Sequence, residues 1–98
     1  MLYIKMMLSQ EKKNKIIEQI LSFLYNSFPK QPFTAEIARE IARDEEFIKR
    51  VLFDLKEKNL VVLIRKNKKG EPFSKRIKWR LSNKVYEIYN SKQNRFSI

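Results

Sequence analysis

The stretch FTAEIAREIARDEEFIKRVLFDLKEKNLV, residues 33–61, contains two amphipathic helix patterns separated by a short turn. The first predicts a helix over 34–42, and the second predicts a helix over 44–58 that begins at the capping carboxylate of Asp44 and ends before Asn59. The residues expected to face inward recur three and four apart: Ile37, Ala38, Ile41, Ile48, Val51, Leu52 and Leu55. Two helices joined by so short a turn predict a helix-turn-helix unit.

N-terminal to this stretch, the spacing predicts a further helix over 9–26, with Ser9 as its N-cap and Pro29 ending it. Its apolar positions are Ile16, Ile17, Ile20, Leu21 and Leu24. Residues 1–8, MLYIKMML, form an apolar extension before that helix. The two-proline connector after it leads to Thr34, whose hydroxyl is expected to cap the next helix.

C-terminal to the stretch, LVVLIRK and RIKWRL are typical of strands, and the connector between them holds the only Gly of the chain and a Pro. We therefore expect an antiparallel β-hairpin over 60–81, with Trp79 on its buried face. Ser82 is expected to cap a last helix over 82–91, followed by a tail over 92–98. The inward residues of that helix are expected to be Val85, Ile88 and Tyr89.

The order helix, helix, helix, hairpin, helix resembles the winged helix-turn-helix domain, and is similar to MarR-type and related archaeal and bacterial regulators. The resemblance covers about residues 16–89, and two segments anchor it: KNLV, where many relatives have Gly in place of Asn59, and RLSNK, residues 80–84. It implies an α+β, mostly α fold with a three-helix core, a two-stranded β-hairpin called the wing, and a C-terminal helix. We expect one domain over 1–98.

Composition narrows the chemistry, because the 98-residue chain has neither Cys nor His. Thiol nucleophiles, disulfides, the commonest metal ligand and the usual neutral-pH proton shuttle are therefore missing. We expect a protein that is not an enzyme and that has no cofactor and no metal. The formal net charge of +11 favours a polyanionic partner. Residues 65–84 carry nine basic side chains and one acidic one, whereas residues 34–63 carry six basic and seven acidic.

The basic segment predicts that the wing contacts phosphates of double-stranded DNA, because like charges at this density gain little for folding without an anionic partner. Its candidate residues are Arg65, Lys66, Lys68, Lys69, Lys75, Arg76, Lys78 and Arg80. In the helix over 44–58 the register directs Glu46, Lys49, Arg50 and Phe53 away from the core. Arg50 suits a guanine edge, Lys49 a phosphate, Glu46 a cytosine amino group, and Phe53 a thymine methyl group or a partner chain.

These features together predict a double-stranded DNA-binding protein, a transcriptional regulator whose wing contacts phosphates while the helix over 44–58 reads the major groove. A winged-helix protein-protein module and a sequence-independent architectural or RNA-binding role are the alternatives. The apolar opening segment predicts a homodimer through residues Met1 to Leu24 and the C-terminal helix. No apolar run reaches the ~20 residues that cross a bilayer, so we expect no membrane contact and a cytoplasmic protein.

Overall fold

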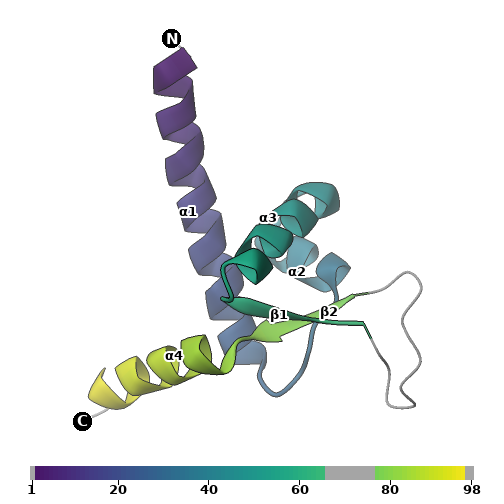
Figure 1. The fold of residues 1–98 in the computed structure, drawn as a ribbon, viewed down its shortest axis with the longest axis vertical. Helices are drawn as coiled ribbons and strands as arrows, with labels where there is room; N and C mark the ends of the chain where they lie inside the picture. Colours follow the sequence, from purple (N-terminus) through teal and green to yellow (C-terminus); the bar gives the residue numbers. More distant parts are fainter. Residues whose placement is uncertain (1, 66–76, 97–98) are drawn as a thin grey trace.

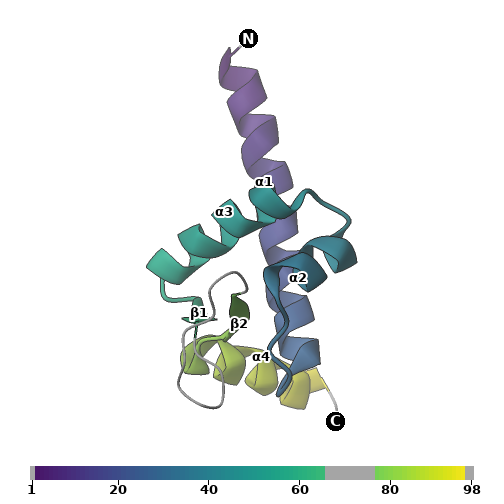
Figure 2. The same cartoon turned by 90° about the vertical axis from the view of Figure 1, so that its right-hand side faces the viewer.

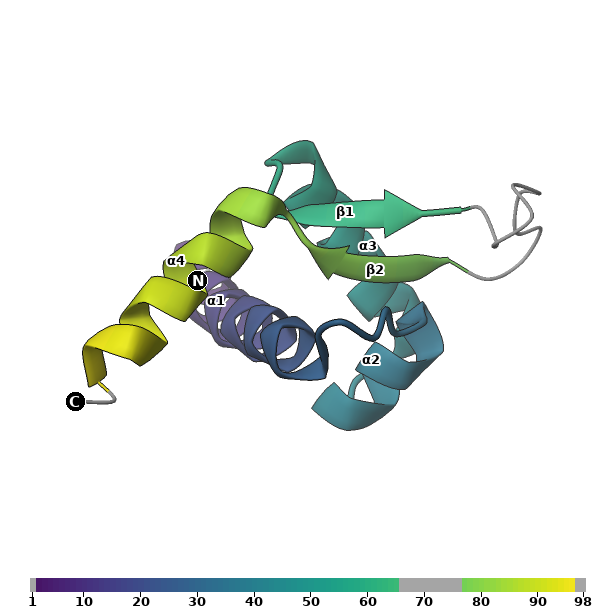
Figure 3. The same cartoon turned by 90° about the horizontal axis from the view of Figure 1, so that it is seen from below.

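The computed structural model describes residues 2–65 and 77–96, and the side chains of residues 11–65 and 77–92 (Figure 1). The elements in chain order are α1 (Leu2–Ser27), α2 (Thr34–Ile41), α3 (Glu45–Glu57), β1 (Val61–Ile64), β2 (Lys78–Leu81) and α4 (Asn83–Phe96). In Figure 2, α3, α2 and the hairpin face the viewer together. Figure 3 shows α4 running away from the hairpin on one side of α1, with α2 on the other side.

Both terminal helices are longer than the sequence patterns predict. The first helix was expected from Ser9, but α1 begins at Leu2, so residues 2–8 continue the helix instead of forming a separate extension. The last helix was expected to end at residue 91, but α4 reaches Phe96. The physical reason is the same at both ends, since these segments contain no Pro or Gly to stop a helix and are rich in Leu, Met, Lys and Gln.

The two central helices lie close to their predicted bounds: α2 begins at the predicted residue and ends one residue early, and α3 is one residue shorter than predicted at each end. The carboxylate of Asp44 accepts a hydrogen bond of 3.2 Å from the backbone N–H of Phe47 and caps α3. Asn59 adopts the left-handed conformation with φ of 62°, and the next amide, of Leu60, donates to the Leu55 carbonyl. Ala42 ends α2 in the same way, with φ of 61° and no glycine.

The expected cap of α2 is wrong, because the Thr34 hydroxyl does not bond to its own helix. Its oxygen accepts a hydrogen bond of 2.8 Å from the indole Nε1–H of Trp79, and both side chains are buried. The Glu36 carboxylate instead satisfies the start of α2, accepting from the Phe33 backbone N–H at 3.1 Å. The hydroxyl of the first residue of α2 therefore bonds to the hairpin instead of capping the helix, and the carboxylate two residues later provides the cap.

The hairpin is antiparallel, with Val61 opposite Leu81 and Ile64 opposite Lys78. The segment before α2 pairs with the other side of β2, through a bridge between Phe33 and Lys78. Trp79 is completely buried, as its alternation in the sequence predicts. The hairpin is therefore held on the rest of the fold in two ways, by the backbone bridge between Phe33 and Lys78 and by the burial of the Trp79 side chain.

The core forms where α1, α2, α3 and the hairpin meet, and it contains all four inward residues predicted for α3. In α4, Val85 is buried as expected, but Ile88 is 46% exposed, so its predicted inward position is wrong. Tyr86 packs against α1 instead, with its ring centroid 5.4 Å from that of Tyr25. Tyr89 faces inward as predicted and stacks on Tyr25, with ring centroids 5.4 Å apart. The inward face of α4 is therefore formed by Val85, Tyr86 and Tyr89, because the aromatic contacts with α1 fix which face turns inward.

Candidate nucleic-acid interface

The outward face of α3 carries the residues that the sequence assigns to base reading. Glu46, Lys49 and Arg50 are all exposed. The buried apolar stripe of the same helix consists of other residues, Ile48, Val51, Leu52 and Leu55. An ammonium group, a guanidinium group and a carboxylate are therefore all exposed on one rigid helix.

Phe53 does not belong to that exposed group. Its ring packs edge-on against Trp79, with centroids 5.6 Å apart and an interplanar angle of 88°. It is half-buried and lies against the core. The expectation that Phe53 faces outward is therefore wrong, because at this end of α3 the hairpin extends over the flank of the helix and provides an aromatic partner.

The acids at the start of α3 have separate structural roles. Asp44 caps the helix, and Glu45 and Glu46 occupy its first turn, where the positive end of the helix dipole favours carboxylates. Each of these three residues is exposed. An acidic start is therefore compatible with a stable α3, although carboxylates at this place would repel a phosphate group that came near.

The described residues at the root of the wing are only partly available for phosphates. Arg65 is exposed, just beyond the end of β1. Lys78 is half-buried, with its Nζ 5.3 Å from the centroid of the Phe33 ring, a cation–π contact. Arg80 is also half-buried and donates from Nη1 to the Leu81 carbonyl at 2.8 Å and to Asn83 Oδ1 at 3.4 Å. Arg80 therefore ties the hairpin to the start of α4.

The remaining predicted wing contacts lie outside the described residues. They are Lys66, Lys68, Lys69, Lys75 and Arg76. Their role in phosphate binding stays a prediction from the sequence.

One group of residues was not found from the sequence. A cleft of about 570 Å³ lies between the starts of α2 and α3 and the segment leading into β2, and both Arg39 and Lys49 line it. Glu36 stands in the same cleft. The hydrogen bond from the Phe33 backbone N–H, together with the charge of Lys30, holds the pKa of Glu36 below its ordinary value of 4.5. Arg39 and Lys49 are ten positions apart on different helices, so no local pattern joins them.

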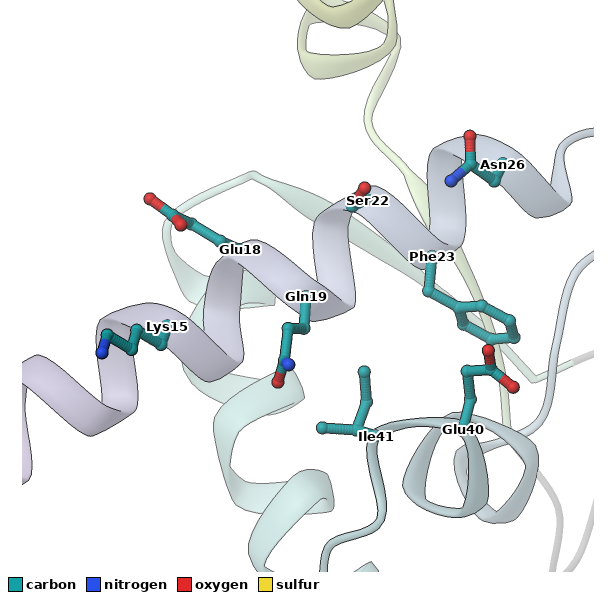
Figure 4. Close-up of a pocket in the computed structure, with 8 residues that line it drawn as sticks. All are labelled: Lys15, Glu18, Gln19, Ser22, Phe23, Asn26, Glu40 and Ile41. Atoms are coloured by element: carbon teal, nitrogen blue, oxygen red, sulfur yellow. The ribbon is translucent and has the colours of Figure 1, made fainter.

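A second, shallow pocket of about 600 Å³ lies between α1 and α2 (Figure 4). Phe23 of α1 lies beside Glu40 of α2 in this view, and Gln19 points toward Ile41. Its lining mixes charged, polar and apolar side chains. Within the described part of the chain, no three acidic, His or Cys side chains are grouped closely enough to hold a metal ion. None of the described helices is long and apolar enough to cross a membrane.

No family model and no curated protein matches the chain. Solved structures do match it. Staphylococcus aureus MepR in its DNA-binding conformation is 18% identical, with a TM-score of 0.61 over 94% of this chain and 73% of that one. The S. aureus MepR–DNA complex is 19% identical, with a TM-score of 0.60 over 95% and 84% of the two chains.

A mutant of Lactococcus lactis ZitR in its apo form is also similar, with 15% identity and a TM-score of 0.59 over 95% of this chain and 69% of that one. At such low identity the likeness concerns the fold. The helical core, antiparallel hairpin and terminal helices described above are thus those of a winged helix-turn-helix domain of the kind found in MepR, as residues 33–61 predict.

Proposed function

We propose that the protein is a transcriptional regulator that binds double-stranded DNA, and that it is a cytoplasmic protein without enzymatic activity. The observation that carries the proposal is that Glu46, Lys49 and Arg50 are all exposed on α3, in a chain whose hairpin leads into a basic segment. A protein of the same fold, S. aureus MepR, has been solved in complex with DNA. The net charge of +11 supplies the long-range attraction that such binding needs.

In this proposal α3 enters the major groove, and its residues make different contacts there. Arg50 donates two hydrogen bonds to the O6 and N7 atoms of a guanine, a geometry that its planar guanidinium fits. Glu46 accepts from a cytosine amino group, the one base-edge donor pattern that suits a carboxylate. Glu45 and Asp44 weaken contact with phosphates near the helix start. The helix therefore contributes selectivity more than affinity.

The wing contributes the larger share of affinity. Its basic residues neutralise backbone phosphates and release counterions, a contribution that does not depend on sequence. Arg65 is the described wing residue that is exposed for this purpose, and Lys66, Lys68, Lys69, Lys75 and Arg76 extend the charge along the chain. Lys78 and Arg80 contribute mainly by supporting the wing, given their local contacts.

The test is Arg50→Ala measured on two duplexes, one selected from a random pool by the wild-type protein and one of unrelated sequence. The loss of a bidentate base contact should weaken binding to the selected duplex about 5- to 100-fold more than binding to the unrelated one. Lys58→Ala, which removes an exposed cation at the C-terminal end of α3, outside the assigned DNA contacts and the proposed dimer segments, is the matched control and should affect both duplexes alike. Equal losses on both duplexes for Arg50→Ala would refute the base-reading role.

We further propose a homodimer formed through residues Met1 to Leu24 and α4. Three observations support it: the first turns of α1 project beyond the rest of the fold in Figures 1 and 2, the sequence of these turns is almost entirely apolar, and Ile88 on α4 is 46% exposed. A two-fold dimer would also place two copies of α3 for two half-sites.

Analytical ultracentrifugation at micromolar concentration tests the dimer. The expected mass is about 24 kDa, twice the 11.9 kDa of one chain, and Ile88→Asp should shift the population toward monomer. A monomer mass for the wild-type protein would refute the dimer while leaving DNA binding open to the Arg50 test.

A further inference from the structure

The cleft between α2, α3 and the hairpin is lined by both apolar and charged side chains. Phe33 and Ile77 in its lining are half-buried, and Thr34 is buried. Arg39 comes from the last turn of α2 and Lys49 from the second turn of α3, and both side chains are exposed. The cleft therefore brings together cations that two separate helices supply.

These two cations have no carboxylate partner within ion-pair distance among the described residues. Glu36, one of the two acids in the lining, is already engaged, because Lys30 Nζ lies 3.3 Å from its Oε2 and the Phe33 backbone N–H bonds to its Oε1. The charge of Arg39 also helps to lower the pKa of Glu36, but neither Arg39 nor Lys49 forms an ion pair of its own among the described residues.

The lining of the cleft is neutral by itself, with Arg39 and Lys49 against Glu36 and Glu45. Lys30 lies outside the lining but pairs with Glu36, and counting it leaves one net positive charge. This balance fits a singly charged anion better than a doubly charged one, because a second negative charge would meet the exposed carboxylate of Glu45 without compensation. A phosphodiester group of a nucleic-acid backbone has one negative charge and two free oxygens.

We propose that Arg39 and Lys49 together hold one phosphodiester group of the DNA backbone in this cleft. The guanidinium of Arg39 binds the two free oxygens through its fork, and the Lys49 ammonium adds a point charge from the other helix. The inference rests on the proposed binding of duplex DNA. Such a contact carries no sequence information, but it fixes the position of α3 relative to the backbone and so sets which bases Arg50 can reach.

The experiment measures duplex affinity across a salt series for Arg39→Gln, Lys49→Gln and the double variant. The matched control is Lys58→Gln, which removes an exposed cation at the C-terminal end of α3, outside the cleft lining and the proposed dimer segments. Each cleft variant should weaken binding about five- to tenfold on selected and unrelated duplexes alike, and Arg39→Lys should recover part of the loss. The Lys58 control should change affinity less than about twofold, because salt screens distant charges.

The salt dependence distinguishes one shared phosphate from two separate ones. The double variant should lower the log–log slope by about 0.9, the value for a single phosphate, whereas two independent contacts would lower it by about 1.8. Thermal unfolding of each variant must match the wild type, as expected for exposed side chains.

Two results would overturn the proposal, and they have different consequences for the proposed function. If the wild-type protein binds duplex DNA but the cleft variants lose no more affinity than the Lys58 control, or the double variant lowers the slope by about 1.8, the shared phosphate is wrong and DNA binding stands. If the wild-type protein binds no duplex DNA at low salt, both the cleft contact and the proposed function are wrong.

Discussion

The hydrogen bond between Trp79 and Thr34 is expected to hold the hairpin on the helical core. It is 2.8 Å long, Trp79 is completely buried, and Thr34 is 7% exposed. The substitution Thr34→Val keeps the shape and the methyl group but removes the acceptor. The indole N–H is then buried without a partner, in a fold whose described buried side-chain polar atoms are all satisfied. Such a group costs about 1–3 kcal/mol.

For a domain of this size each kcal/mol lowers the melting temperature by about 4–8 °C. Thr34→Val should therefore lower the melting temperature by roughly 4–24 °C, measured by circular dichroism, with a matching loss of unfolding free energy in urea. The control is the same substitution in a Trp79→Phe background, where no donor remains, and there it should cost nothing or stabilise slightly. An equal cost of Thr34→Val in both backgrounds would show that the hydrogen bond is not its cause.

Three further predictions concern charge. The lowered pKa of Glu36 means that its charged form stabilises the fold above the ordinary value of 4.5, and that this contribution is lost as the pH falls through the lower folded value. Glu36→Gln should thus destabilise the protein by about 0.5–1 kcal/mol at neutral pH, and by less and less as the pH falls below 4.5 and through the lower folded pKa of Glu36, measured by urea unfolding. Asp44→Asn should change stability by less than about 0.5 kcal/mol, because asparagine caps equally well, yet raise duplex affinity in a gel shift. Combining Lys68→Ala with Lys69→Ala should weaken all duplexes alike and lower the salt slope by about 0.9 for each lost contact.

The parts of the fold that local patterns control could be predicted from the sequence. The inward stripe of α3 follows from three-to-four spacing, the cap at Asp44 from its carboxylate, and the end of that helix from the tolerance of Asn59 for positive φ. The burial of Trp79 follows from alternation along a strand. Each of these depends on residues that are close together in the chain.

The features that could not be predicted depend on tertiary contacts. The Thr34 hydroxyl has two possible partners, and only the packing of the hairpin decides for Trp79. Phe53 faces outward on an isolated helix but meets the same indole ring in the fold. The cleft cations Arg39 and Lys49 lie on different helices, so their convergence depends on the angle at which α2 and α3 cross.

Equilibrium binding to duplex DNA over a salt series tests the central claim most directly. The protein should bind duplex DNA in preference to single-stranded DNA and RNA, and its affinity should fall by about 10³-fold or more between about 50 and 200 mM salt if six or more phosphates are neutralised. Absence of duplex binding at about 50 mM salt would contradict the account and favour a protein-binding role for the winged helix.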